Sequence, residues 1–177
     1  MRASYRIEAM LEFQLSFETS ADEQERYKQL PAALAGLLDG ETDAFANLSN
    51  AAALIFAGLK RINWAGFYLL RGDTLVLGPF QGKPACVRIA LGQGVCGTAA
   101  QRRETLVVPD VHAFPDHIAC DAASRSEIVV PILDGGILRG VLDVDSPEKG
   151  RFGEPERKVL ESCVRELVPR VDWATFA

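Results

Sequence analysis

Apolar residues follow two different spacings along this chain, and the spacing changes near residue 61. Before that point they recur every three or four positions, which is the period of a helix that buries one side. After it they mostly alternate with polar residues in short runs, as in strands. The predicted helices span residues 22–38, 43–60 and 94–102, and a last one begins near Glu154. The predicted strands span residues 62–70, 74–80, 86–91, 105–108, 127–133 and 137–145.

The apolar stripes of the predicted helices identify candidate core residues. The stripe of the helix over residues 43–60 comprises Phe45, Leu48, Ala52, Ile55 and Leu59. Thr42 or Asp43 is placed to cap this helix, because a short polar side chain can accept a hydrogen bond from the first turn. Cys163 lies on the inward stripe of the last helix, and we therefore expect it to be a core residue.

The order of the elements predicts the fold class. Helices precede and follow a run of strands with short connections, and such an arrangement favours an α+β domain with a largely antiparallel sheet of about six strands. We expect a single domain over residues 21–177. Residues 1–20 show no sustained period and are predicted to form a loosely ordered lead.

Composition and charge narrow the classes of function. The chain has 177 residues, of which 48% are hydrophobic and 24% charged, as is typical of a globular domain with a substantial core. The net charge of −5 and the lack of a Lys/Arg cluster argue against binding to nucleic acid or to an anionic membrane. The longest apolar run, residues 51–59, has about half the length of a membrane span. The pattern of an export signal is missing, so we expect a cytoplasmic protein.

Four cysteines in such a chain indicate catalytic or redox-active thiols rather than a structural disulfide framework. Cys86, Cys96 and Cys120 lie beside glycine, proline and charged residues, where core packing alone does not place a cysteine. Cys120 belongs to a long segment, residues 109–125, which also holds both histidines, and loops of that length are usually functional. We therefore predict redox chemistry at these three thiols.

Three acids lie on two of the predicted strands. Asp143 and Asp145 are two residues apart, so they point to the same face, and Glu127 opens the neighbouring strand. One interpretation is a solvated outer face with unrelated acids. The other is a cluster in which repulsion keeps a proton on one carboxyl group near neutral pH, so that the cluster can bind an ammonium and donate a proton.

Trp64 and Tyr68 also share one face of a predicted strand. Aromatic residues in such positions are most often part of the core. The alternative is an aromatic wall that holds the apolar arm of a ligand.

Gly92, Gly94 and Gly97 match the spacing of a dinucleotide-binding loop, and Asp110 stands near the position of a ribose-binding acid. The helix that follows is short, and the chain continues with a hairpin rather than further βα units. We therefore interpret the glycines as shaping a tight loop.

A zinc site is the remaining alternative. Its candidate ligands are Cys86, Cys96, Cys120, His112 and His117. The cysteines are 10 and 24 residues apart and lack the short paired spacing of structural zinc sites. We expect neither a metal nor a cofactor.

Several short motifs, in this order, resemble those of the free methionine-(R)-sulfoxide reductases, a family of stand-alone GAF-domain enzymes. They are residues 63–68 (NWAGFY), 78–83 (GPFQGK), 94–99 (GVCGTA), 108–111 (VPDV), 117–121 (HIACD), 126–131 (SEIVVP) and 140–146 (GVLDVDS). The resemblance covers roughly residues 47–147. It implies a GAF fold, in which helices pack on one face of an antiparallel sheet.

The resemblance also implies an activity, which is thiol-dependent reduction of free methionine-(R)-sulfoxide. On this basis Cys120 is the attacking thiol, Cys86 the principal resolving thiol, and Cys96 the third family cysteine. The implied substrate ligands are Glu127, Asp143, Asp145, Trp64 and Tyr68. Glu127 and Asp143 are the candidate proton donors. A thioredoxin-type reductant is the implied partner, and a homodimer is expected from the family alone.

One position departs from the family pattern. Family members commonly have glycine just before the residue that corresponds to His117, and this chain has Asp116. Asp tolerates a positive φ better than most residues, but it adds a charge near Cys120. The rival class of function is a GAF module that binds a small molecule without catalysis.

Overall fold

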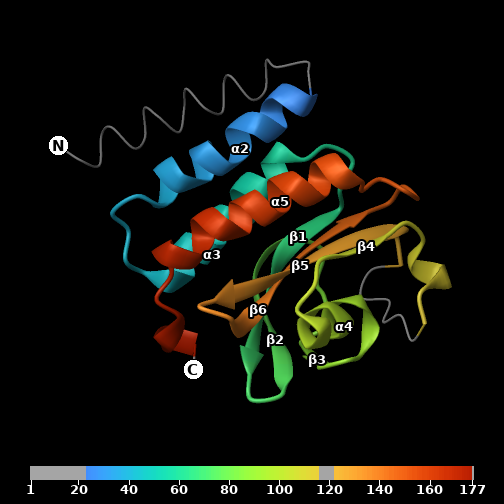
Figure 1. Ribbon diagram of the computed structural model, residues 1–177. Coiled ribbons are helices and arrows are strands. Elements are labelled where there is room, and N and C mark those ends of the chain that lie inside the picture. Colours follow the sequence, from blue (N-terminus) through green and yellow to red (C-terminus); the bar gives the residue numbers. More distant parts are fainter. Residues whose placement is uncertain (1–22, 116–121, 177) are drawn as a thin grey trace.

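The computed structural model describes residues 23–115 and 122–176 (Figure 1). The predicted lead over residues 1–20 lies outside this range. The helices are α2 (Glu23–Leu38), α3 (Ala44–Gly58), α4 (Gly94–Arg102) and α5 (Glu154–Leu167), with 3-10 turns η1 (Val111–Ala113), η2 (Val168–Arg170) and η3 (Trp173–Phe176). The strands are β1 (Trp64–Arg71), β2 (Thr74–Gly82), β3 (Arg88–Ala90), β4 (Leu106–Val108), β5 (Ser126–Asp134) and β6 (Ile137–Ser146).

The strands form one six-stranded sheet in the order β3-β2-β1-β6-β5-β4, and every neighbouring pair is antiparallel. Helices α2, α3 and α5 cover one face of this sheet, while the short α4 packs on the opposite face (Figure 1). The prediction of an α+β domain with an antiparallel sheet of six strands is confirmed, and the three longer helices lie on one face as expected. The sheet separates two apolar cores, one beneath the three longer helices and one beneath α4.

Helix α3 begins as predicted, and four residues of its predicted stripe, Leu48, Ala52, Ile55 and Leu59, are buried. The side chain of Asp43 accepts a hydrogen bond from the backbone N–H of Ala46 (2.7 Å), so Asp43 is the cap. Phe45 was predicted to lie in the core, and this is wrong, because its side chain is 63% exposed. Asn47 is turned inward, where its amide donates to the carbonyls of Glu41 and Arg170 (3.1 and 2.7 Å). This orientation buries Ala44 and leaves Phe45, about 100° further round the helix, in solvent.

Helices α2 and α5 are joined by a buried charged group. The guanidinium of Arg151 donates to the carboxylate of Glu156 (2.7 Å) and to the hydroxyl of Tyr27 (2.8 Å). Tyr27 in turn donates to Glu156 (2.9 Å). On α5, Cys163 is buried in the helix-side core, as predicted.

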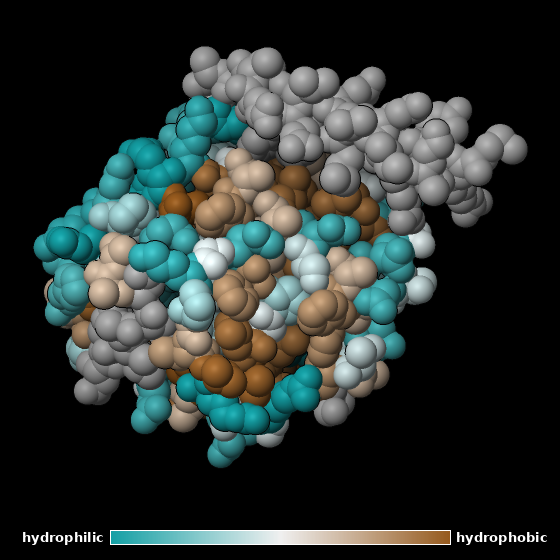
Figure 2. All heavy atoms as spheres, turned by 180° about the vertical axis from the view of Figure 1, so that it is seen from behind, coloured by the Kyte–Doolittle hydropathy of each residue, from teal (hydrophilic) through white to brown (hydrophobic). Residues whose placement is uncertain are grey.

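Strand β3 is shorter than predicted, because it begins at Arg88 rather than at Cys86. Residues 83–87 form a loop between β2 and β3, and Cys86 lies in this loop. The long loop predicted over residues 109–125 is present in its described parts and contains the turn η1. Among the helices of residues 23–115 and 122–176, none has the length and apolar character needed to cross a bilayer. Seen from behind, the surface carries apolar side chains in the middle of the face, between polar ones (Figure 2).

Candidate active site

The face of the sheet opposite the three longer helices brings the predicted acids together. On β1 and β6, Trp64 lies opposite Asp145 and Gly66 lies opposite Asp143. On β5, Glu127 lies opposite Asp145 on the other side of β6. Directly paired residues of neighbouring strands point to the same face. The three acids and the aromatic residues of β1 therefore surround one site, and the interpretation as a solvated outer face is wrong, because Glu127 and Asp143 are each only 6% exposed.

Cys96 of helix α4, which packs on this face of the sheet, also contacts the acids. Its sulfur lies 3.7 Å from Oε1 of Glu127. The sulfur of Cys96 and one carboxylate oxygen from each of Glu127 and Asp143 lie within 4.8 Å of one another. In the part of the chain that the structure describes, these are the residues whose arrangement suits a cation.

The glycines before and within α4 allow this close approach. A Cβ atom on Gly97 would lie 2.3 Å from the carbonyl oxygen of Ala90, so a larger residue would push α4 away from the end of β3. The N–H of Gly92 also donates to the carbonyl of Gly97 (2.8 Å). The glycines shape a tight loop, as we inferred from their sequence.

Glu127 and Asp143 have higher pKa values than exposed carboxyl groups, which favours their protonated forms. Burial raises the pKa of Glu127 well above its usual value, and the neighbouring charge of Asp143 raises it further. Burial also raises the pKa of Asp143 to about 7, although hydrogen bonds from Cys96 and Glu127 oppose that rise. Two adjacent buried carboxyl groups do not both ionise readily. The pair therefore retains a proton at neutral pH.

One oxygen of Asp143 is available for a contact with a ligand. Its Oδ1 atom is buried and has no hydrogen-bond partner among the described residues. A buried carboxylate oxygen without a partner is costly, and a bound polar group would satisfy it. Burial and the charge of Asp143 also raise the pKa of the Cys96 thiol, so Cys96 stays protonated.

Trp64 and Tyr68 form an aromatic wall beside the acids. Their ring centroids are 5.9 Å apart and the rings stack. Phe80 of β2 extends the wall, with its ring 5.3 Å from that of Trp64. Gly66 makes room for this stack, because a Cβ atom there would lie 2.3 Å from Cβ of Phe80. Sequence reasoning did not single out Phe80, and the signal that identifies it is its cross-strand pairing with Gly66.

The cysteines of the described residues differ in their surroundings and in their redox state. Cys86 is half-buried in the loop over residues 83–87 and takes part in a disulfide. Cys96 and Cys163 are free and buried. Cys120, with Asp116 and His117, lies outside the described residues.

The candidate ligands of the alternative zinc site are not gathered among the described residues. His112 is exposed on η1, Cys86 is in a disulfide, and Cys96 faces the acids.

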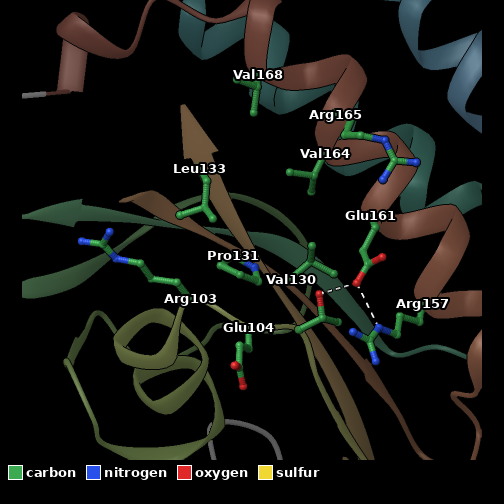
Figure 3. Close-up of a pocket in the computed structure, with 11 residues that line it drawn as sticks. Arg103, Glu104, Val130, Pro131, Leu133, Arg157, Glu161, Val164, Arg165 and Val168 are labelled. Carbon is green, nitrogen blue, oxygen red and sulfur yellow. Dashed lines mark hydrogen bonds and ion pairs between the residues drawn. The ribbon is translucent and has the colours of Figure 1, made fainter. Parts of the chain in front are cut away.

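A separate cavity of about 680 Å³ lies between α5, β5 and residues 103–105, which precede β4 (Figure 3). Inside it, Glu161 accepts hydrogen bonds from Thr105 (2.7 Å) and Arg157 (3.0 Å). The cavity contains none of the predicted site residues, and this acid is already paired.

Known proteins resemble this chain in both sequence and structure. A sequence model of the GAF domain matches residues 36–168. The free methionine-R-sulfoxide reductase of Escherichia coli is 52% identical over 143 residues, which are 81% of this chain and 87% of that protein.

Two solved structures extend this result. A free methionine-R-sulfoxide reductase from Neisseria meningitidis, solved in complex with its substrate, is 41% identical with a TM-score of 0.84, and the match covers 89% of this chain and 95% of that one. A protein from Burkholderia vietnamiensis described as a putative GAF sensor is 56% identical with a TM-score of 0.82, and the match covers 85% of this chain and 96% of that one.

Proposed function

The chain belongs to the GAF-domain family and, within it, to the free methionine-R-sulfoxide reductases; from this premise we propose that it reduces free methionine-(R)-sulfoxide to methionine. The observation that carries the proposal is the buried pair Glu127 and Asp143, which retains a proton beneath the aromatic wall. With this activity the protein is an oxidoreductase that acts on a sulfur group through its own thiols, without a cofactor.

In the first step the thiol of Cys120 attacks the sulfur of the sulfoxide. A sulfur–sulfur bond forms while the sulfoxide oxygen takes up a proton. The hydroxyl group then moves from the methionine sulfur to the sulfur of Cys120, so that the S–O bond to methionine and the sulfur–sulfur bond both break. The products are methionine, reduced by two electrons, and the sulfenic acid of Cys120, oxidised by two electrons.

The sulfoxide oxygen is a poor leaving group unless it is protonated. The pair Glu127 and Asp143 supplies this proton, since a carboxylic acid kept neutral near pH 7 can act as a general acid at neutral pH. The unpaired Oδ1 of Asp143 supports a direct contact with the substrate.

Asp145 is the ligand for the substrate ammonium. It is less buried than the other two acids and lies opposite both Trp64 and Glu127 in the sheet. A peptide-bound methionine lacks the free ammonium, so this contact selects the free amino acid. Trp64 and Tyr68 line the side of the site that holds the apolar arm of the substrate.

In the second step the thiol of Cys86 condenses with the sulfenic acid, and a disulfide and one water form. Two observations support Cys86 in this role: it takes part in a disulfide, while Cys96 and Cys163 are free thiols. An external dithiol of the thioredoxin class then reduces the disulfide by thiol exchange. Cys96 serves as an accessory thiol beside Glu127.

The protein works in the cytoplasm as a homodimer in this proposal. The apolar side chains gathered on the face in Figure 2 support a second copy as partner, since large apolar patches on soluble proteins commonly mark interaction sites.

A count of free thiols in the fully reduced protein, before and after addition of free methionine-(R)-sulfoxide, tests the function. The reductase loses two thiols and releases methionine. A sensor module, the class of function for which the Burkholderia protein is named, binds without loss of any of its four thiols. That second result would refute the proposal.

The roles of the thiols are tested in a single turnover without reductant. Cys120→Ser should yield no methionine, and one methionine per chain from this variant would contradict the assignment. Cys86→Ser should release methionine once but should fail to recycle with thioredoxin. Peptide mapping of the oxidised enzyme identifies the bridge, and a dominant Cys96–Cys120 bridge would transfer the resolving role to Cys96.

A further inference from the structure

The loop that carries Cys86 is attached to the aromatic wall by two side-chain hydrogen bonds. The indole N–H of Trp64 donates to the carbonyl of Lys83 (3.1 Å). The hydroxyl of Tyr68 donates to the carbonyl of Cys86 itself (3.1 Å). Both donors are almost fully buried, so water does not compete for them. Burial and the charge of Asp143 raise the pKa of Tyr68, so its hydroxyl keeps the proton that it donates.

The two ends of this loop are fixed as well. Gly82 ends β2 with a φ of +128°, and a Cβ atom there would lie 2.7 Å from Cδ1 of Trp64. At the other end of the loop, the carbonyl of Val87 accepts a hydrogen bond from the N–H of Leu77 (3.0 Å). Between these points the side chains of Trp64 and Tyr68 hold the loop through their two hydrogen bonds, and one of these bonds is made at the residue whose thiol is oxidised.

We propose that Trp64 and Tyr68 are positioning residues for Cys86, which hold its backbone in the place where its disulfide forms. This assigns the wall a second task besides lining the substrate site. The inference rests on the proposed function for the catalytic meaning of the disulfide, but the positioning itself requires no substrate.

The position of Cys86 determines how readily its disulfide forms from two thiols. In exchange with glutathione, the protein dithiol and one oxidised glutathione give the protein disulfide and two reduced glutathiones. A loop already held in place loses less conformational freedom when the bond closes. Loss of one donor should therefore shift this equilibrium toward the dithiol.

The test measures that equilibrium for the full chain without substrate. Tyr68→Phe keeps the ring and removes only the hydroxyl, and Trp64→Phe removes the indole N–H. We expect each to lower the equilibrium constant by about two- to tenfold, the usual range for one net hydrogen bond. Leu138→Ala is the control: it disturbs the core beneath α4 but removes no donor to the loop and changes no residue of the wall's hydrogen bonds, so its constant should equal that of the wild type.

An unchanged constant in both Tyr68→Phe and Trp64→Phe would overturn the proposal, as would an equal decrease in Leu138→Ala. Because no sulfoxide is present, these results do not depend on the reductase activity, and failure of the proposed function would appear only in the methionine assay.

A second measurement separates positioning from substrate binding. During turnover, a trap for sulfenic acid such as dimedone should label more of the Tyr68→Phe variant than of the wild type, because the resolving thiol arrives later. A residue that only binds substrate would slow the formation of the sulfenic acid and would not raise the label. A labelled fraction equal to or below that of the wild type contradicts the positioning role.

Discussion

The two faces of the central sheet are made by the same strands but contain opposite kinds of residue. On β1 and β6, the residues that face the three longer helices are Ala65, Phe67, Leu69, Leu142 and Val144. The intervening residues of these strands face α4, and they include Trp64, Gly66, Tyr68, Asp143 and Asp145. Strand alternation thus separates an aliphatic face that stabilises the fold from an acidic and aromatic face suited to chemistry.

The buried charges of the two faces also differ. On the helix side, the carboxylate of Glu156 accepts hydrogen bonds from Arg151 and Tyr27, and these contacts lower its pKa although burial opposes the change. On the site side, burial raises the pKa of Glu127 and Asp143, and one oxygen of Asp143 has no partner among the described residues. The first arrangement favours the folded state, while the second destabilises the ionised acids and so favours their protonated form, as the proposed proton transfer requires.

The strongest test of this contrast is to remove an acid without changing its shape. Asp143→Asn or Glu127→Gln should lower kcat by about a hundredfold to ten-thousandfold, the usual contribution of a general acid. At pH 8 the thermal midpoint should stay the same or rise, because an amide avoids the cost of burying a charge. Steady-state kinetics and thermal unfolding measure the two effects. A fall in kcat of less than tenfold would contradict the role of the pair in proton transfer.

The neighbouring residue on the other face should show the reverse behaviour. Leu142→Ala removes a fully buried side chain from the helix-side core and should reduce the free energy of unfolding by about 2–5 kcal/mol. The kcat of the folded fraction should remain close to that of the wild type. Urea denaturation gives the free energy, and assays well below the thermal midpoint give kcat. A large loss of kcat at full folding would show that the two faces are not independent.

Much of this contrast could be predicted from the sequence, because strand alternation is a local property. The spacing of Asp143 and Asp145 placed them on one face, and Trp64 and Tyr68 likewise share a face. The inward position of Phe45 was wrong because the rotation of α3 depends on the bond from Asn47 to Arg170, far away in the chain. The attachment of the Cys86 loop to Trp64 and Tyr68 was not foreseen, since the acceptors are backbone carbonyls, which leave no mark in a sequence.

The two faces should also respond to pH with opposite signs. The pKa of Asp143 is about 7 in the folded state against a usual 3.8, so between these values the folded chain binds more protons than the unfolded chain. The free energy of unfolding therefore falls as pH rises from about 4 to about 7 through this group, by at most roughly 4 kcal/mol. Glu156, with its lowered pKa, contributes stability that is lost on acidification.

Urea unfolding at several pH values, for the wild type and for Asp143→Asn, isolates the contribution of the site. The difference in free energy of unfolding, variant minus wild type, should increase from pH 4 to pH 8. A difference that is constant over this range would show that Asp143 is not held protonated by the fold.

The smallest expected effect concerns Asp145, the acid of the site that is least buried. Asp145→Asn should raise the apparent KM for free methionine-(R)-sulfoxide by about ten- to more than hundredfold, since one charged hydrogen bond to an ammonium contributes roughly 1.5–3 kcal/mol. The kcat should change much less, because the ammonium is bound before and during the reaction alike. N-acetyl-methionine-(R)-sulfoxide lacks the ammonium and therefore removes the same contact from the substrate side. The wild type should reduce this compound slowly, and Asp145→Asn should lower that rate little further. If the wild type uses both substrates with equal efficiency, the acids do not bind the ammonium, and the site face selects the sulfoxide alone.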